Sequence, residues 1–172
     1  GAIAKTIWVT SGALERIRYT SNYNVYWAAS ATTLRSWQAD HSVSIDWRSR
    51  LTTGLSHTEE FKQFEKDFRN RKTGVEFGFN TRSFESITTG FTAGRNFDSD
   101  FQLWTTAAAY KVTDALSAEY ELQRLVLDPD PGDENTWIHA IRANQYFTRD
   151  LFLRVFLQTN SAIDRRNVQA VF

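Results

Sequence analysis

The stretch LFLRVFLQTN, residues 151–160, indicates the fold more clearly than any other part of the sequence. Its odd-numbered positions hold Leu, Leu, Val, Leu and Thr, and its even-numbered positions hold Phe, Arg, Phe, Gln and Asn. Successive side chains of a β-strand point to opposite faces of the sheet. The alternation therefore predicts a strand with one apolar face and one mixed face.

The same alternation recurs along most of the chain. One further apolar row consists of Phe101, Leu103, Thr105, Ala107 and Ala109. We predict about eleven strands, most of about nine to eleven residues, which is the length that crosses a bilayer when tilted. They are expected near residues 2–9, 14–27, 36–47, 50–59, 73–81, 84–94, 98–110, 115–127, 136–146, 150–159 and 167–172.

The connections between these strands alternate between short and generally longer segments. The short ones are 10–13, 48–50, 81–83, 111–114 and 147–150, and the longer ones are 28–35, 60–72, 94–97, 128–135 and 160–166. This alternation predicts an up-and-down meander within a single all-β domain over residues 1–172. The best helical candidate is Thr58–Phe68, which overlaps the longest connection and spaces Phe61, Phe64 and Phe68 at helical intervals, and it predicts one or two helical turns.

The composition excludes several classes of protein. The 172 residues include no Cys, so disulfide bonds and thiolate metal or redox sites are excluded. The 20 Lys and Arg balance the 20 Asp and Glu, so the charge that usually attracts nucleic acid is missing and no nucleic-acid partner is expected. No apolar run is long enough for a membrane-spanning helix. Because the chain begins with Gly, we expect a processed, recombinant or partial product, truncated at both ends in the last case.

Two environments are compatible with the alternation. A soluble, lipocalin-like barrel places its apolar residues inside, whereas a membrane barrel places them outside and encloses a polar lumen. The low Lys content and the strand lengths favour the membrane barrel. In that case charged residues of both signs line the lumen, and the candidates are Asp46, Arg48, Glu76, Glu85, Glu119, Glu121, Arg142 and Arg154.

Aromatic residues near the predicted strand ends point the same way, although ordinary core packing also explains them. The ten-residue step from Trp37 to Trp47 spans about 33 Å along a strand and about 25 Å of height at a tilt of about 40°, the thickness of an outer-membrane apolar belt. The candidates for its aromatic girdles are Trp27, Trp37, Trp47, Tyr110, Trp137 and Phe147. His41, His57 and His139 also fall in the apolar rows, which is unfavourable at the middle of a membrane.

Three segments near the C-terminus carry a resemblance to a known family. They are KVTDALSAEYE (residues 111–121), NQYFTRDLFLR (144–154) and LQTNS (157–161). Residues 110–172 resemble the C-terminal region of a bacterial outer-membrane β-barrel family, whose members carry an N-terminal carbohydrate-binding-like domain and a barrel of unassigned function. The resemblance implies a location in the bacterial outer membrane. The carbohydrate-binding-like domain has no counterpart in this sequence, so no sugar-binding role is implied.

Catalytic residues are not expected. The neighbours His41 and Ser42, and likewise Ser56 and His57, point to opposite faces of a strand and cannot act together. The acidic residues Asp128, Asp130, Asp133 and Glu134 form either a calcium site or a solvated loop. The basic residues Arg69, Arg71, Lys72, Arg165 and Arg166 either hold phosphates of surface lipid or belong to solvated loops.

Three hypotheses follow. The first is an outer-membrane β-barrel, or a fragment of one, of about ten to twelve strands, acting as a pore, transporter or scaffold. It is not an enzyme, it holds no cofactor or metal, and its partners are outer-membrane lipid, other subunits or missing portions of the same chain. The second is a soluble β-barrel that binds an apolar ligand. The third is a structural subunit of a larger membrane assembly, whose unpaired edges need a partner.

Overall fold

The computed structural model describes residues 1–29, 33–80, 85–129, 135–163 and 165–172. Within these residues the chain forms eleven β-strands. They are β1 (Ala2–Trp8), β2 (Leu14–Trp27), β3 (Leu34–Trp47), β4 (Leu51–Gln63), β5 (Asp67–Asn80), β6 (Ser86–Asn96), β7 (Ser99–Lys111), β8 (Leu116–Asp128), β9 (Thr136–Tyr146), β10 (Phe152–Asn160) and β11 (Arg165–Val171). No helix in the described part of the chain is long and apolar enough to cross a membrane.

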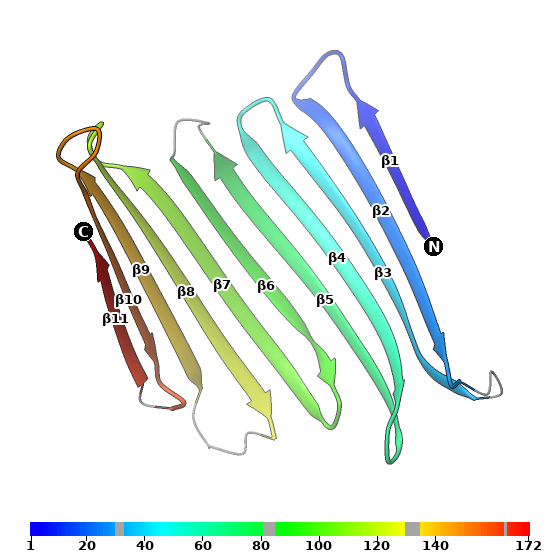
Figure 1. Ribbon diagram of the computed structural model, residues 1–172. Helices are drawn as coiled ribbons and strands as arrows, with labels where there is room; N and C mark the ends of the chain where they lie inside the picture. Colours follow the sequence, from blue (N-terminus) through cyan, green and yellow to red (C-terminus); the bar gives the residue numbers. More distant parts are fainter. Residues whose placement is uncertain (30–32, 81–84, 130–134, 164) are drawn as a thin grey trace.

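Each strand pairs antiparallel with the next strand along the chain, so the predicted up-and-down meander is confirmed. Figure 1 shows the strands side by side in one tilted sheet. We call the end with the β1–β2 connection the turn end, at the top of Figure 1, and the end with the β2–β3 connection the loop end, at the bottom. Connections fall alternately at these two ends because every strand reverses the direction of the one before it.

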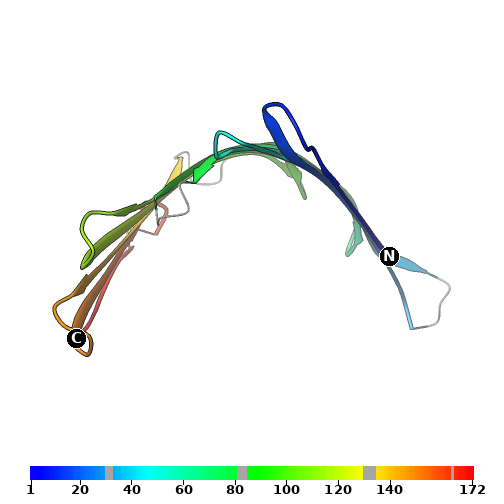
Figure 2. The same ribbon diagram turned by 90° about the horizontal axis from the view of Figure 1, so that it is seen from above.

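The sheet is curved but it is not closed. Figure 2 shows an open arch, with β1 and β11 on opposite sides of the opening. In the described residues β1 pairs only with β2, and β11 pairs only with β10. A barrel requires its first and last strands to meet. The structure therefore supports an all-β, eleven-stranded antiparallel sheet, and the closure expected from the sequence is not formed.

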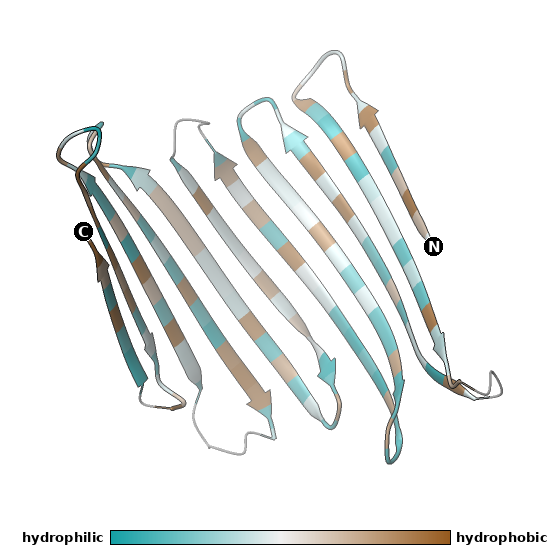
Figure 3. Ribbon diagram, in the orientation of Figure 1, coloured by the Kyte–Doolittle hydropathy of each residue, from teal (hydrophilic) through white to brown (hydrophobic). Residues whose placement is uncertain are grey.

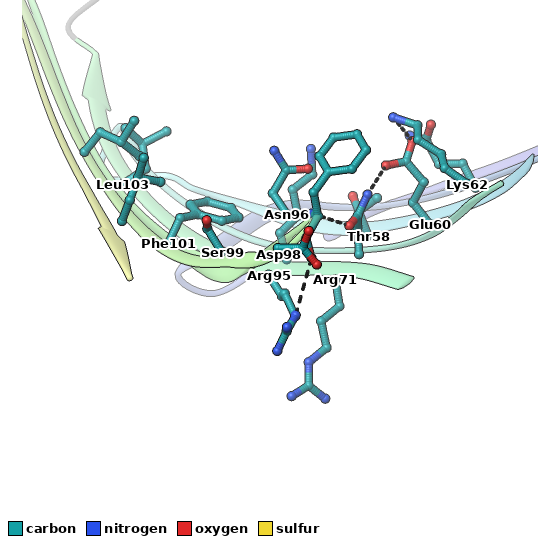
Figure 4. Close-up of a pocket in the computed structure, with 16 residues that line it drawn as sticks. Thr58, Glu60, Lys62, Arg71, Arg95, Asn96, Asp98, Ser99, Phe101 and Leu103 are labelled. Carbon is teal, nitrogen blue, oxygen red and sulfur yellow. Dashed lines mark hydrogen bonds and ion pairs between the residues drawn. The ribbon is translucent and has the colours of Figure 1, made fainter. Parts of the chain in front are cut away.

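The strand register sorts the side chains onto two faces. One row of directly opposed residues crosses β4 to β11: Leu51, Phe79, Ile87, Ala108, Tyr120, Ile141, Leu157 and Val168. Another crosses β3 to β11: Asp46, Thr52, Gly78, Thr88, Ala107, Glu121, Ala140, Gln158 and Asn167. Figure 4 shows Glu60 of β4 inside the curve of the sheet and Arg71 of β5 outside it. Glu60 lies on the same face of β4 as Thr52, because both are even-numbered, and Arg71 lies on the same face of β5 as Phe79, because both are odd-numbered. The second row therefore lies on the concave face, and the first on the convex face.

The prediction of helical turns over Thr58–Phe68 is wrong. The strand β4 continues to Gln63, β5 begins at Asp67, and a hairpin joins them. Here Lys62 lies opposite Phe68 in the register. The pairing of two long strands outweighs the helical spacing of three aromatic residues. In the sheet, the backbone of each strand forms hydrogen bonds at every second residue with the neighbouring strand on either side.

The connection 94–97, predicted to be one of the longer ones, is also different. The strand β6 continues to Asn96 and β7 begins at Ser99, which leaves a tight turn of Phe97 and Asp98. Phe97 takes a left-handed backbone conformation with φ of 54°. The short turn fixes the register so that Gly94 faces Phe101, and the apolar row that begins at Phe101 consequently lies on the concave face.

The sheet is a single layer without a core of its own. No hydrophobic residue in the described part of the chain is buried, and Asn70 is the one buried polar or charged residue found there. Large convex side chains remain uncovered, among them Leu55 at 53% exposure, Phe77 at 57% and Val168 at 67%. Water-soluble domains bury such side chains between two packed layers. Here the second layer is not supplied by the described residues.

Candidate functional site

Most of the predicted lumen-lining residues lie on the concave face. Asp46, Glu76, Glu119, Glu121, Arg142 and Arg154 occupy alternate strand positions that the register places on this side. The other two predicted residues lie outside the strands. Arg48 follows β3 and donates from Nη2 to the carbonyl oxygen of Val9 at 2.5 Å, and Glu85 precedes β6.

Charges of opposite sign meet on the concave face. Arg16 forms an ion pair with Asp46. Further along the sheet, Arg142 Nη1 lies 3.4 Å from Glu119 Oε2. Arg154 Nε donates to the amide oxygen of Asn144 at 2.7 Å. The two ion pairs neutralise charge on this face. All three contacts connect neighbouring strands and so support the local register.

A denser network lies on the concave face near the loop end, centred on Glu60. Lys62 Nζ lies 2.8 Å from one oxygen of the Glu60 carboxylate, and Asn70 Nδ2 donates to the other at 3.0 Å. Asn70 Oδ1 in turn accepts a hydrogen bond of 2.7 Å from the backbone N–H of Phe97. Asn70 is only 7% exposed, and these two hydrogen bonds satisfy its buried amide group. They also link the β4–β5 hairpin to the β6–β7 turn.

An apolar wall faces this network across a hollow of about 740 Å³. The wall consists of Phe101, Leu103, Leu125 and Leu127, all of them half-buried. Figure 4 shows Phe101 and Leu103 on one side of the hollow and Glu60 and Lys62 on the other. The hollow thus offers hydrogen-bonding groups opposite hydrocarbon, which is the usual make-up of a small-molecule site.

Sequence reasoning missed this hollow, although one signal was present. Glu60 and Lys62 belong to the even-numbered row of β4. The sequence prediction ended this strand at residue 59 and assigned both residues to a loop. On β8 the polar row of Glu119 and Glu121 continues into Leu125 and Leu127, so the concave face becomes apolar toward the loop end. A change of polarity along one row of a strand marks the apolar wall.

The predicted girdle aromatics lie at or beside strand ends. Trp27 ends β2 and Trp137 is the second residue of β9, both at the loop end, where Trp37 also lies. Trp47 and Tyr110 lie at the turn end of β3 and β7. Phe147 follows β9 at the turn end. Figure 3 shows hydrophobic positions alternating with hydrophilic ones along the strands between these two ends.

The three histidines on the convex face each have a hydroxyl partner on a neighbouring strand. His41 Nδ1 lies 3.1 Å from the Tyr19 hydroxyl, and His139 Nδ1 lies 2.8 Å from the Tyr120 hydroxyl. His57 Nδ1 lies 2.8 Å from Thr73 Oγ1. A neutral imidazole with such a partner is far less costly in an apolar environment than an unpaired one.

The pairing of His with Ser in the sequence carries no catalytic geometry. Ser42 lies on the concave face, where its hydroxyl meets Thr20 Oγ1 at 2.5 Å, whereas His41 lies on the convex face. The described residues contain no group of three or more His, Cys, Asp and Glu able to hold a metal ion. Of the acidic loop considered as a calcium site, Asp128 ends β8, and Asp130, Asp133 and Glu134 lie outside the described residues.

The basic residues expected in loops belong to strands instead. Arg69, Arg71 and Lys72 lie within β5, and Arg165 and Arg166 lie in β11. Alternation separates Arg69 and Arg71 on the convex face from Lys72 on the concave face. The three basic residues of β5 are therefore divided between the two sides of the sheet, and the other two lie in β11, six strands away.

No family model, no curated protein and no solved structure matches the chain. What the structure supports is an eleven-stranded antiparallel meander. The resemblance of residues 110–172 to an outer-membrane barrel family stays an expectation.

Proposed function

We propose that this chain forms the wall of a β-barrel in the bacterial outer membrane, with its convex face toward lipid and its concave face toward a polar lumen. Its role there is that of a pore, transporter or scaffold without catalysis. The partners of the convex face are lipid chains, and the partners of the sheet edges are further strands of the same chain or of another subunit.

The observation that carries the proposal is an extensive apolar face on a sheet without a second layer. Ile87 is 50% exposed, Ile141 42% and Leu51 47%, and all three belong to one row on the convex face. Soluble monomers rarely expose contiguous apolar patches of more than a few hundred Å². A β-sheet in a membrane needs no second protein layer, because lipid covers its apolar face and its backbone groups are paired between strands.

The position of the tryptophans agrees with this orientation. Trp37 and Trp47 lie near opposite ends of β3, and their row includes the apolar residues Val43 and Ile45 between them. Trp and Tyr are enriched at the two membrane–water interfaces because their rings are apolar and their N–H or O–H groups are polar. The spacing along β3 therefore suits two interfaces.

The open edges support a specific form of the proposal, in which this sheet is one part of a larger closed structure. Among the residues that the structure describes, nothing pairs with the outer edge of β1 or of β11. Unpaired N–H and C=O groups are strongly unfavourable in the hydrocarbon of a membrane. A barrel in the membrane consequently requires an additional strand, segment or subunit to join the two edges.

The experiment is fractionation of cells that express the chain, followed by extraction. We expect the protein in the outer-membrane fraction, resistant to high salt and alkaline carbonate and released by detergent, because its apolar face would contact lipid chains directly. A stable monomer in the aqueous fraction without detergent would contradict the proposal. It would favour the soluble barrel, in which an apolar ligand or a second layer covers these side chains.

A further inference from the structure

Three arginines gather on the convex face near the loop end. Arg71 of β5 and Arg95 of β6 are direct partners in the register, and Arg69 lies two residues before Arg71 on the same face. Direct partners on one face have Cβ atoms about 5 Å apart. All three side chains are exposed. Figure 4 shows Arg71 and Arg95 pointing out of the sheet together, away from the concave hollow.

The backbone between these strands is unusually close. A Cβ atom added to Gly94 would lie 2.0 Å from the carbonyl oxygen of Arg71 and 2.6 Å from the Cα of Lys72. Only a residue without a side chain fits there. Gly94 therefore allows β6 to approach β5 next to the Arg71–Arg95 pair, which holds the two arginines side by side.

The arginines lack a carboxylate partner. Neither Arg71 nor Arg95 forms an ion pair within the described part of the chain, although Glu59 and Asp100 are their other neighbours in the register. Glu59 instead lies 3.5 Å from His57 Nε2. Two like charges directly opposite each other destabilise a sheet. An anion placed between them removes that repulsion.

The surroundings of the cluster indicate where the anion comes from. Phe61 lies opposite both Arg69 and Trp37 in the register, and the Trp37 ring lies 6.3 Å from that of Tyr23. A hollow of about 370 Å³ is lined by Trp37 and by the three arginines, together with Glu59, Glu60 and Asn70. Aromatic residues beside the apolar face mark the depth of the lipid headgroups. Arginine suits the phosphates found at that depth, because its guanidinium forms two parallel hydrogen bonds to one phosphate.

We propose that Arg69, Arg71 and Arg95 form a binding site for the phosphate of an anionic lipid headgroup at the loop end of the convex face, a headgroup without the choline cation that neutralises the phosphate of phosphatidylcholine. This inference rests on the proposed membrane location, and it adds a specific lipid contact to it. The site would fix the depth of β5 and β6 in the membrane, since a bound headgroup holds this point of the sheet at the interface.

The test compares binding of the purified full chain to vesicles of phosphatidylcholine alone and of phosphatidylcholine with a minor fraction of phosphatidylglycerol. The wild type is expected to prefer the second. Each basic side chain near an anionic membrane contributes roughly fivefold to partitioning, so Arg71→Gln should lower the preference about fivefold and the Arg71→Gln/Arg95→Gln variant about thirtyfold. Lys72→Gln is the matched control, because it removes one positive charge at the residue next to Arg71 but on the concave face. The attraction to anionic lipid falls off with distance from the membrane surface, so this variant should lower the preference less than twofold.

Two further measurements separate a site from a general surface charge. The Arg71→Lys/Arg95→Lys variant keeps both charges but not the two-pronged guanidinium, and it should lose part of the preference. Inorganic phosphate competes for the same guanidinium groups, so it should reduce the preference more than sodium chloride at the same ionic strength. If phosphate reduces the preference no more than chloride does, the attraction is unspecific and the headgroup site is overturned. If the wild type binds inorganic phosphate but shows no preference for phosphatidylglycerol, the ligand is a free anion and the headgroup site is again overturned.

The outcomes also distinguish the two proposals. If the wild type binds neither kind of vesicle, the membrane location is wrong and the headgroup site is overturned with it. If the wild type binds both kinds and the glutamine variants behave like Lys72→Gln, only the headgroup site is overturned. If the Arg71→Lys/Arg95→Lys variant and the wild type show the same preference for phosphatidylglycerol, unspecific charge attraction explains the binding and the headgroup site is overturned.

Discussion

The convex and concave faces of this sheet are built from the same eleven strands, yet they are suited to different environments. The convex row from Leu51 to Val168 is apolar in every strand that it crosses. The concave row from Asp46 to Asn167 alternates charged, hydroxyl, amide and small residues. The difference teaches that one strand can present an apolar surface on one side and a polar surface on the other, because successive side chains point to opposite faces of the sheet.

The two faces also differ in how their side chains are stabilised. Concave residues find partners within the sheet, as in the network of Glu60, Lys62 and Asn70. The apolar convex residues find little cover, and Phe77 remains 57% exposed. The concave face can thus meet water as it is, whereas the convex face depends on something outside the described chain.

The largest expected effect comes from placing a charge on the convex face. Val75→Arg should destabilise the protein in vesicles by about 2–4 kcal/mol, the cost of an arginine near the middle of the lipid face of a barrel. Val75 lies in the row of Val43, which is roughly midway between Trp37 and Trp47. Glu76→Arg changes the adjacent residue, on the concave face, and should change stability by less than about 1 kcal/mol. Denaturant unfolding of both variants in vesicles measures the difference. Equal effects would show that the two faces do not meet different solvents.

A smaller loss is expected within the β5–β6 contact. Gly94→Ala should destabilise by about 1–3 kcal/mol, because a Cβ at this position overlaps the backbone of β5. Gly54→Ala is the matched control, since its Cβ would meet the nearest atom, Glu76 Cβ, at an ordinary 3.6 Å. The free energy of unfolding of the two variants checks this. A neutral Gly94→Ala would mean that β5 and β6 are farther apart than the structure shows.

The polar network offers a comparable test of the concave face alone. Asn70→Ala should cost about 1–3 kcal/mol, because the Phe97 N–H loses its partner and Glu60 loses a donor in a partly buried place. Asn22→Ala, on the exposed part of the same face, should change stability by less than about 0.5 kcal/mol. Faster hydrogen exchange at the Phe97 amide would identify the broken contact. Unchanged exchange there would contradict the assigned role of Asn70.

The smallest effect on stability is expected from the Arg142–Glu119 pair, which is partly exposed to solvent. Loss of such a pair costs about 1 kcal/mol or less. Under the proposed function a larger effect is expected on ion selectivity, because charge that lines a pore selects ions. Glu119→Gln should shift the selectivity of any conductance toward anions and Arg142→Gln toward cations, as measured by reversal potentials in a planar bilayer. Shifts in the same direction for both variants would mean that the pair does not face the conducting path.

Much of the sheet could be predicted from the sequence, but not the details near the loop end. The alternation around Leu153 and Leu157 predicts both the strand and the set of residues that share its apolar face, because that property depends only on residue parity. The β4–β5 hairpin was missed because three phenylalanines at helical spacing resemble one face of a helix. The concave position of Phe101 was missed because it depends on a two-residue turn at Phe97, and a shift of one residue moves every side chain to the other face.

The candidate site divides in the same way. The polar row with Glu119 and Arg142 was predicted from alternation, and the pairing of these two residues follows from the register. The Arg71–Arg95 pair could not be predicted, since two residues 24 positions apart become neighbours only when β5 and β6 pair. Their closeness also needs Gly94, whose role depends on the distance between two backbones.

The sequence by itself determined that the chain is an antiparallel meander with two unlike faces, because these properties arise from local periodicity and short connections. Only the tertiary structure decided which face is concave, which residues are opposed across strands, and that the edges of the sheet remain apart. These features depend on register, twist and curvature, which are set by the pairing of strands distant in sequence.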